Sequence, residues 1–476
     1  MLPRLLPPSY ERPGTMPIAG HWRVGRADRT LTDCDPWSGE VLVRIREADV
    51  TDVDDACATA DIARHRWGQS VPERRAAVMR AAADLVTARH DELAQWLIHE
   101  TGATTAKVAI ELGVVRAAFL AAAALPYQAE SRILPSDVPG AETRVYRRPA
   151  GVVCLIGAWD LPLYLTTRTL AAALALGNAV VLKPSSHTPV SGGLLPARLL
   201  EEAGLPDGVL NVVVGQAAEI GDALVSHPIP QVVAFTGSAE AGLRIAREAG
   251  LKRLLLEVGG NAPLVVLDDA DLAYAVESAL FGAFFPNGQI RTIANRVIVD
   301  ATRHDEFVDR IVDRARRLVI GDPSDPVTDI GPMISRRHLE AVRDKVKRSA
   351  AQGAEVLLGG DPIGPTGLAL PPQVLLGTND VVTAQEEIFG PVLTIIRAHD
   401  EHEAALLAND TAHGPCNAVH TRDSQRGARF ALRLNAGTTH VNGGPPHDES
   451  PSVLNALDCA AVIDRFTVDH RVVTQR

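Results

Sequence analysis

Short apolar runs that alternate with longer helical segments constrain the fold of this chain most strongly. Between residues 151 and 236, four runs rich in branched apolar residues are separated by segments with a helical pattern. Strands joined by crossover helices pair in parallel, and helices cover both faces of the sheet they form. We therefore expect a parallel sheet, with strands at 152–156, 179–182, 210–214 and 232–235 and helices at 166–176, 192–203 and 218–226.

The rest of the chain is organised around this sheet. Residues 50–127 read as helical, residues 262–436 repeat the α/β pattern, and the segments 128–148 and 466–474 read as extended. A chain of 476 residues is long enough for two large domains and a small one. We expect a first domain at 1–127 and 149–256, a second at 257–436, and a small β unit at 128–148 and 437–476.

Composition argues against some classes of partner and bears on the cellular compartment. Hydrophobic residues make up 46% and charged residues 22%, which is typical of a globular protein. A net charge of -11 without a Lys/Arg block argues against nucleic acid. We identify no apolar run of the roughly 18–20 residues that a membrane span needs, and no secretory signal. The five scattered cysteines, among them Cys154 in an apolar run, suggest reduced, packed thiols. We expect a cytoplasmic protein with neither nucleic acid nor membrane as a partner.

Gly237 and Ser238 form the first candidate binding element. They follow an expected strand and open a helix, where free backbone N–H groups favour a pyrophosphate. The same pattern is also an ordinary helix cap, and its spacing is not that of a standard dinucleotide-binding loop. The element alone therefore indicates a dinucleotide only weakly.

Motifs along nearly the whole chain resemble the NAD(P)-dependent aldehyde dehydrogenases. The matching segments lie in the family's order, at 157–163, 183–185, 254–263, 288–297, 386–392 and 437–443. The last segment is similar to the benzaldehyde and vanillin dehydrogenase branch. The resemblance implies an α/β fold with a Rossmann-like cofactor domain, an α/β catalytic domain and a small β oligomerisation arm. It also implies a homodimer or homotetramer that acts on a small molecule.

The resemblance implies NAD or NADP as the cofactor and assigns residues to it. Lys183 matches the lysine that contacts the adenosine ribose, and Glu387 the glutamate that holds the nicotinamide ribose. Phe389 matches the ring beside the nicotinamide. The other cofactor residues on matching motifs are Trp159, Ser186, Gly237 and Ser238.

Ser186 bears on the choice between NAD and NADP. Many members that prefer NAD have a glutamate at this position, which chelates the ribose hydroxyls. Without that carboxylate, a 2′-phosphate meets no like charge, so NADP is at least tolerated. A serine that merely lies in a loop fits the sequence equally well.

Three residues match the family's reaction site, and two of them depart from its pattern. Glu257 falls on the general base. Arg291 stands where the family has its nucleophilic cysteine, and a guanidinium does not attack a carbonyl carbon as a thiolate does. Asp160 stands where an asparagine holds the developing oxyanion, which a carboxylate would repel. We expect a direct ion pair between Asp160 and Arg291, either as a plug in a retired site or as an anchor for an anionic substrate.

These departures lead to the prediction that the chain does not carry out ordinary thioester-mediated aldehyde oxidation. One hypothesis is a repurposed enzyme, which uses direct hydride transfer with Glu257 as base or a non-redox lyase or cyclase step. The alternative is an inactive pseudoenzyme with a scaffolding or cofactor-binding role. A third interpretation, an artificial Arg291, is disfavoured by Asp160 and by the unrelated segment 450–463. We expect no metal site, because the acidic and histidine residues at 447–449 are adjacent on a loop and point in different directions.

Overall fold

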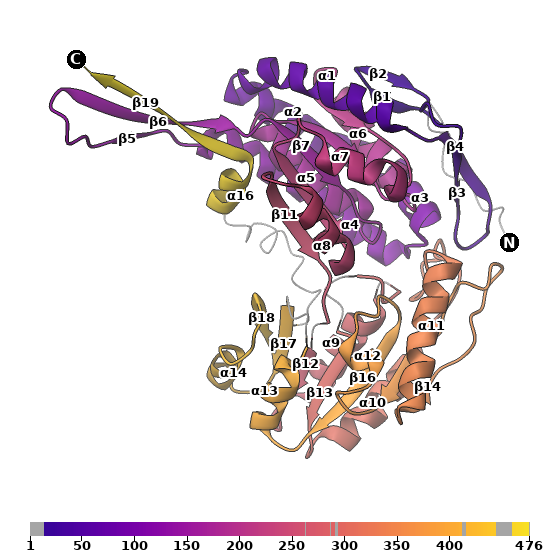
Figure 1. Ribbon diagram of the computed structural model, residues 1–476. Coiled ribbons are helices and arrows are strands. Elements are labelled where there is room, and N and C mark those ends of the chain that lie inside the picture. Colours follow the sequence, from indigo (N-terminus) through magenta and orange to yellow (C-terminus); the bar gives the residue numbers. More distant parts are fainter. Residues whose placement is uncertain are drawn as a thin grey trace.

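The chain folds into two α/β units, one above the other in Figure 1, and a long β arm that projects from the upper unit. This computed structural model describes residues 14–261, 263–285, 287–290, 294–411, 416–443 and 459–475. The predicted α/β class is confirmed. The description of fold and site below concerns these residues.

The first unit is built on the parallel sheet that the apolar runs predict. Its strand order is β11-β10-β7-β8-β9, and every pairing in it is parallel. The inner strands are buried on both faces, which explains their unbroken apolar sequences. Cys154 lies in β7 with no exposed surface, as predicted. The strands are β7 (Val152–Ile156), β8 (Ala179–Lys183), β9 (Leu210–Val212), β10 (Val232–Gly237) and β11 (Arg253–Val258).

Helices cover this sheet, close to the expected positions. Two of them begin with a π-helical turn, η1 (Val190–Leu194) before α6 and η2 (Ala217–Gly221) before α7. The helices that precede the sheet in sequence are α1 (Val50–Gly68), α2 (Pro72–Ala88), α3 (His90–Thr101) and α4 (Thr105–Gln128). Those between its strands are α5 (Pro162–Ala175), α6 (Leu195–Glu202), α7 (Asp222–Ser226) and α8 (Ala239–Glu248).

Helix α4 corrects the expectation that no segment is apolar enough to cross a membrane. It has 24 residues, and its most apolar 18-residue window reaches a mean hydropathy of 2.0. The charges of Lys107, Glu111 and Arg116 interrupt the apolar run in sequence, so it is not visible as an unbroken stretch. In the fold, 56% of that window is buried, and α4 packs against α2 and α5. It is a core helix of the first unit.

The second unit contains a seven-stranded sheet in the order β14-β15-β16-β13-β12-β17-β18. All its pairings are parallel except that of β14 with β15. The strands are β12 (Pro263–Val266), β13 (Arg296–Asp300), β14 (Glu355–Leu358), β15 (Gln373–Leu376), β16 (Val392–Ala398), β17 (Cys416–His420) and β18 (Thr438–Val441). The helices are α9 (Leu272–Phe284), α10 (His304–Arg316), α11 (Arg336–Ala351), α12 (Val382–Gln385), α13 (Glu401–Asn409) and α14 (Ser424–Ala431).

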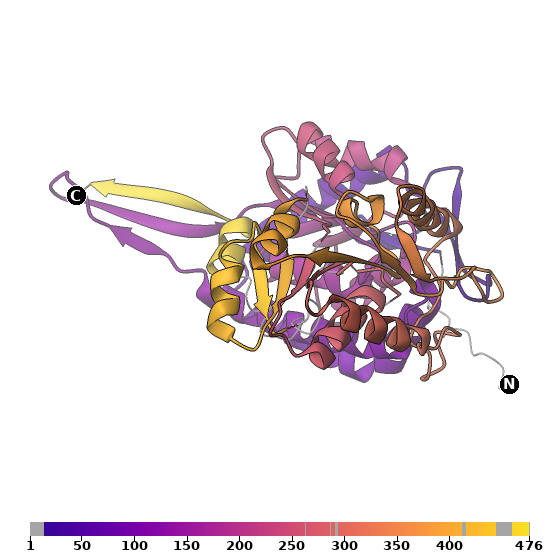
Figure 2. The same cartoon turned by 90° about the horizontal axis from the view of Figure 1, so that it is seen from below.

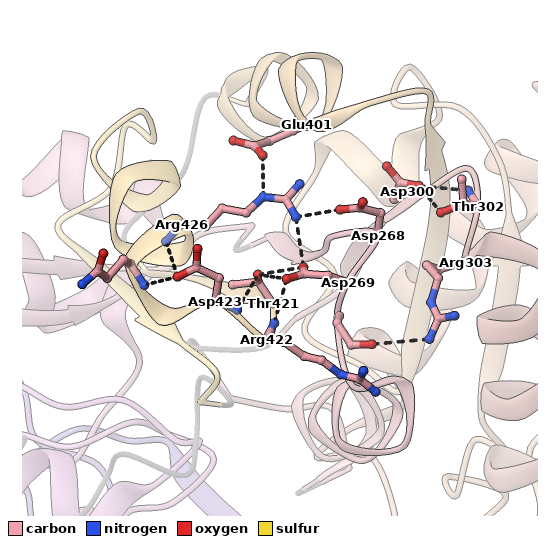
Figure 3. A network of polar contacts seen from close by, with 12 residues as sticks. Asp268, Asp269, Asp300, Thr302, Arg303, Glu401, Thr421, Arg422, Asp423 and Arg426 are labelled. Atoms are coloured by element: carbon pink, nitrogen blue, oxygen red, sulfur yellow. Dashed lines mark hydrogen bonds and ion pairs between the residues drawn. The ribbon is translucent and has the colours of Figure 1, made fainter.

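An ion-pair network ties together the carboxyl ends of β12 and β17 (Figure 3). Arg426 at its centre pairs with Asp268 (2.7 Å), Asp269 (3.1 Å) and Glu401 (2.8 Å). Asp269 also accepts a hydrogen bond from the Thr421 hydroxyl (2.7 Å). Networks of this kind stabilise more than isolated surface pairs do.

The remaining strands form two N-terminal hairpins and the arm. The hairpins pair β1 (Met16–Ile18) with β2 (His21–Arg23) and β3 (Thr30–Cys34) with β4 (Val41–Arg46). In the arm, β6 (Ala141–Pro149) lies between β5 (Arg132–Leu134) and β19 (Thr467–Gln475), with α16 (Cys459–Phe466) at its base. Both views show the arm extending away from the body of the protein (Figures 1 and 2).

Candidate active site

A cleft of about 460 Å³ opens where the strand order of the first sheet reverses. The chain runs outward from β7 through β8 to β9 and then returns to place β10 on the other side of β7. In open parallel sheets, ligands bind at such a switch point, beyond the carboxyl ends of the strands. Ile156 and Gly157 at the end of β7, and 235–238 at the end of β10, line the cleft. The topology thus creates the cleft at the predicted binding element.

All the residues predicted to bind the cofactor lie in this one cleft. They come from three strand ends and from the loop before β16, and are Trp159, Lys183, Ser186, Gly237, Ser238, Glu387 and Phe389. Asp160, predicted as a reaction residue, lines the same cleft. Its volume lies within the range of small-molecule sites.

Lys183 places a buried cation at one side of the cleft. Its side chain is 3% exposed, and its ammonium donates to the Pro184 carbonyl (3.1 Å), which uses one of three N–H donors. Burial lowers the pKa of Lys183 to about 8, partly opposed by the charge of Glu47. A buried ammonium with spare donors suits ribose hydroxyls or a phosphate, so it fits a nucleotide.

The start of α8 forms the next part of the wall. Ser238 caps the helix, and its hydroxyl accepts a hydrogen bond from the Ala241 amide (3.3 Å). A Cβ at Gly237 would lie 2.5 Å from the Phe235 ring, so only glycine fits between this ring and the cleft. The partial positive charge of the helix start and its exposed amides fit the pyrophosphate of a dinucleotide.

An aromatic cluster forms the opposite wall. The Trp159 ring lies edge-on to the rings of Phe389 (5.2 Å) and His338 (5.3 Å). Phe389 has a left-handed backbone with φ of 59°, a conformation that is strained for a residue with a side chain. The Nε2–H of His338 donates to its carbonyl (2.7 Å) and so holds it in place.

Glu387 is positioned by close contact with the backbone of Gly259. A Cβ on Gly259 would lie 1.8 Å from Glu387 Oε1, so the carboxylate occupies the space that any side chain there would need. The ammonium of Lys345 donates to the Glu387 carbonyl. Gly259, two residues after the expected general base, therefore makes room for a cofactor residue from a distant segment.

Glu257 lies beside the cleft rather than in its wall. It faces a small neighbouring cavity of about 30 Å³, which shares Phe235 and Thr236 with the cleft. Its carboxylate forms an ion pair with Arg168 of α5 and accepts a hydrogen bond from the Thr236 hydroxyl (3.3 Å). The structure thus places the expected base one strand away from the cofactor residues of β10.

Two buried side chains of α4, Lys107 and Glu111, hold the loop that carries Asp160 and the start of α5. The Asp160 carbonyl accepts from the Lys107 ammonium, and the Glu111 carboxylate accepts from the amides of Leu163 (3.0 Å) and Tyr164 (3.1 Å) at the start of α5. Burial raises the pKa of Glu111 to about 7, while Lys107 opposes the shift. The loop that carries Asp160 is therefore fixed by contacts with α4.

The segment before the expected nucleophile position is fastened to the loop 331–334. Asn287 accepts from the Gly331 amide (2.6 Å) and donates to the carbonyls of Gly102 (3.1 Å) and Pro332 (3.2 Å). Gln289 accepts from the Ile334 amide (3.0 Å). Arg291 lies outside the described residues, and so do 447–449 and most of 450–463; the Asp160–Arg291 ion pair stays a prediction.

Sequence reasoning missed four residues that shape the site. Arg168, Lys107 and Glu111 position groups of the reaction side, and His338 positions Phe389. Lys107 and Glu111 were detectable as two charges, four residues apart, on a mostly apolar helix. The contacts of Arg168 and His338 join distant segments, and no local pattern in the sequence indicates them.

The cleft at the switch point, the buried lysine and the capped helix define a nicotinamide-dinucleotide-binding α/β protein. The aldehyde dehydrogenase family model matches residues 22–453. A vanillin dehydrogenase of Corynebacterium glutamicum is 40% identical over 95% of this chain and 94% of its own length. The chain belongs to the aldehyde dehydrogenase family.

Two solved structures extend this comparison. An NAD-dependent benzaldehyde dehydrogenase from Corynebacterium glutamicum has a TM-score of 0.90 and 39% identity, with 97% of each chain covered. A betaine aldehyde dehydrogenase from Staphylococcus aureus, in complex with NAD+, has a TM-score of 0.91 and 28% identity, covering 97% of this chain and 94% of that one. The fold is that of the aldehyde dehydrogenases, and the cofactor is NAD or NADP.

The prediction of a chain without ordinary aldehyde oxidation is wrong. Relatives at about 40% identity over most of the chain are named vanillin and benzaldehyde dehydrogenases, which points to ordinary aldehyde oxidation. The prediction rested on the departures from the family pattern at Arg291 and Asp160. Hydride transfer belongs to the cofactor, and the cleft that fits the cofactor is retained.

Proposed function

We propose that this chain oxidises an aromatic aldehyde to its carboxylic acid and transfers the hydride to NAD or NADP. The position of Glu257 carries the proposal. Its carboxylate faces a cavity next to the cofactor cleft, and this cavity shares two wall residues with the cleft. The names of the relatives support the aromatic class of substrate. In the overall reaction, aldehyde, water and oxidised cofactor give carboxylic acid, reduced cofactor and a proton.

The residues in and beside the cleft have different roles in this reaction. When bound, the cofactor supplies the hydride acceptor. Lys183 and Glu387 would hold its two riboses, and the start of α8 would hold the pyrophosphate. The Glu257 carboxylate would accept a proton from the water that adds to the carbonyl carbon, either of the aldehyde or of an acyl intermediate. Its ion pair with Arg168 orients the carboxylate until then.

The direct test measures the formation of reduced cofactor when benzaldehyde or vanillin is the substrate, with an aliphatic aldehyde as the control. We expect reduced cofactor with both aromatic aldehydes and a higher kcat/KM for them than for the aliphatic one. Arg291→Cys is the informative variant, since a thiolate adds a strong nucleophile at the position of the family cysteine; we expect it to raise kcat. Activity in that variant alone, with none in the native chain, would refute the proposed function.

We also infer a homo-oligomer, assembled through the arm and the free edge of the first sheet. The arm exposes Ile133 (70%), Val473 (65%) and Tyr146 (39%), which a monomer would leave in water. Strand β11 is an edge strand, and Leu256 on it is 36% exposed. Light scattering should give a mass of two or four chains, and Ile133→Asp combined with Val473→Asp should lower it. A monomer at micromolar concentration would contradict this inference.

A cytoplasmic location is inferred as well. The three cysteines whose side chains the structure describes are free thiols, as expected in a reducing compartment. Burial raises the pKa of the Cys57 thiol to about 12, which keeps it protonated and unreactive.

A further inference from the structure

Helix α5 takes its capping group from α4 and not from its own sequence. Leu161 precedes the helix and provides no side-chain cap. The Glu111 carboxylate of α4 instead accepts, through Oε1, from the amides of Leu163 (3.0 Å) and Tyr164 (3.1 Å). The amides at a helix start lack partners within the helix and carry partial positive charge, so they bind a carboxylate well. Glu111 therefore fixes the start of α5 to α4.

Helix α5 reaches the reaction site at two points. The loop before it carries Asp160, which lines the cofactor cleft. Farther along the helix, Arg168 pairs with Glu257, the base of the proposed reaction. The Arg168 guanidinium lies over the ring of Tyr164 (5.6 Å), and the amide of Tyr164 is one of the two that Glu111 binds. A shift at the start of α5 would therefore displace both Asp160 and Arg168.

Glu111 changes its charge near neutral pH. Its side chain has no exposed surface, and its Oε2 has no hydrogen-bond partner among the described residues. Burial raises the pKa of Glu111 to about 7; Lys107 and the two amides oppose the shift, and Asp160 adds to it. Lys107 lies four residues earlier on α4, Asp160 lies on the loop before α5, and Arg168 lies beyond the Tyr164 ring. Hydrogen bonds to a charged group are stronger than those to a neutral one, so protonation of Glu111 weakens its hold on α5.

We propose that Glu111 is a positioning residue for aldehyde oxidation, which as a carboxylate holds Asp160 and Arg168 in place through the first turn of α5. The inference rests on the proposed function. Glu111 lines neither the cofactor cleft nor the cavity beside Glu257, so it acts through α5 and not on the substrate. It gives kcat a pH dependence in addition to that of the general base.

The test compares kcat of Glu111→Gln with that of the native chain between about pH 5.5 and about pH 8.5, with benzaldehyde and cofactor at saturation. Glutamine resembles the protonated carboxyl group, so the ratio of the two kcat values should be near one at the acid end. At the alkaline end, where the native Glu111 is ionised, we expect the variant to be about threefold to tenfold slower. Protonation of Glu257 lowers kcat in both proteins and cancels in the ratio.

Glu100→Gln is the matched control. Glu100 is also buried and accepts from two backbone amides, those of Val190 and Ser191 (both 2.7 Å), and burial raises its pKa to about 7. It binds the turn η1 and not the start of α5, so the ratio of its kcat to the native value should be the same at every pH. Thermal melting of each variant checks that it folds.

Lys107→Met tests Glu111 without replacing it. The Lys107 ammonium lowers the pKa of Glu111, so its removal should move the rise of kcat to higher pH. A role of Lys107 in structure alone would instead lower kcat by the same factor at every pH.

Three results would overturn the inference: a kcat ratio for Glu111→Gln that is constant with pH, the same pH dependence in Glu100→Gln, or an unshifted rise of kcat in Lys107→Met. Hydrogen exchange separates the inference from the proposed function. At alkaline pH the backbone amides of 162–166 should exchange about threefold to tenfold faster in Glu111→Gln, whether or not the chain oxidises aldehydes. A native chain that oxidises no aldehyde at any pH would refute the proposed function, whereas unchanged exchange would refute the hold of Glu111 on α5.

Discussion

Replacement of Glu257 by glutamine should lower kcat for aldehyde oxidation by about a hundredfold to ten thousandfold. An amide has the shape of the carboxylate but does not accept the proton of the attacking water. Affinity for NAD should stay within about twofold, since Glu257 faces the neighbouring cavity and not the cofactor cleft. Steady-state kinetics and calorimetric titration with NAD measure the two quantities separately.

Arg168→Met is the control that distinguishes a role of Glu257 as general base from a role in a structural ion pair. It removes the partner of Glu257 but leaves the carboxylate in place, so kcat should fall much less than in Glu257→Gln. Equal losses in the two variants would show that the ion pair, and not proton transfer, accounts for the effect. A Glu257→Gln protein that keeps more than about a third of native kcat would also contradict the role of base.

Gly288→Ala should destabilise the protein far more than Gly250→Ala. Gly288 has φ of 64°, and a Cβ there would lie 2.2 Å from the Gly390 carbonyl carbon and 2.5 Å from the Pro391 nitrogen. These are backbone atoms, which cannot move aside as a flexible side chain can. We expect a loss of more than about 4 kcal/mol in the free energy of unfolding, together with weaker cofactor binding, because 386–391 carries Glu387 and Phe389.

Gly250→Ala provides a matched control for this prediction. Gly250 has φ of 63°, and an added Cβ meets nothing within 4 Å. Alanine there should cost only the backbone strain of the left-handed region, about 1 kcal/mol. Thermal and urea unfolding of both variants would measure the difference. Similar losses in the two would mean that contact between 287–290 and 386–391 contributes little to stability.

The elements of the cofactor cleft were predictable because each carries a local signal. Apolar runs of five residues mark the strands, and Gly237 with Ser238 marks the end of one strand and the start of a helix. Parallel strands bring their carboxyl ends to one edge, so Lys183 at the end of β8 reaches the same cleft. Here local pattern and topology lead to the same site.

Contacts between distant segments were not predictable in this way. The Arg168–Glu257 pair joins α5 to β11, and the carbonyl of the strained Phe389 accepts a hydrogen bond from His338 of α11. The prediction of a lost reaction failed for a related reason. It weighed Asp160 and Arg291 together as a rebuilt pocket, but from matched motifs alone, whereas the reaction depends on the whole set of groups around the bound substrate and cofactor.

Deuterium at the formyl carbon of benzaldehyde tests the proposed oxidation most directly. The native chain is incubated with the labelled aldehyde and with NAD or NADP, and mass spectrometry then follows both products. The account predicts benzoate without deuterium and reduced cofactor with one deuterium, formed in equal amounts. Benzaldehyde that is recovered unchanged, or a product that retains the deuterium while the cofactor stays oxidised, would contradict it.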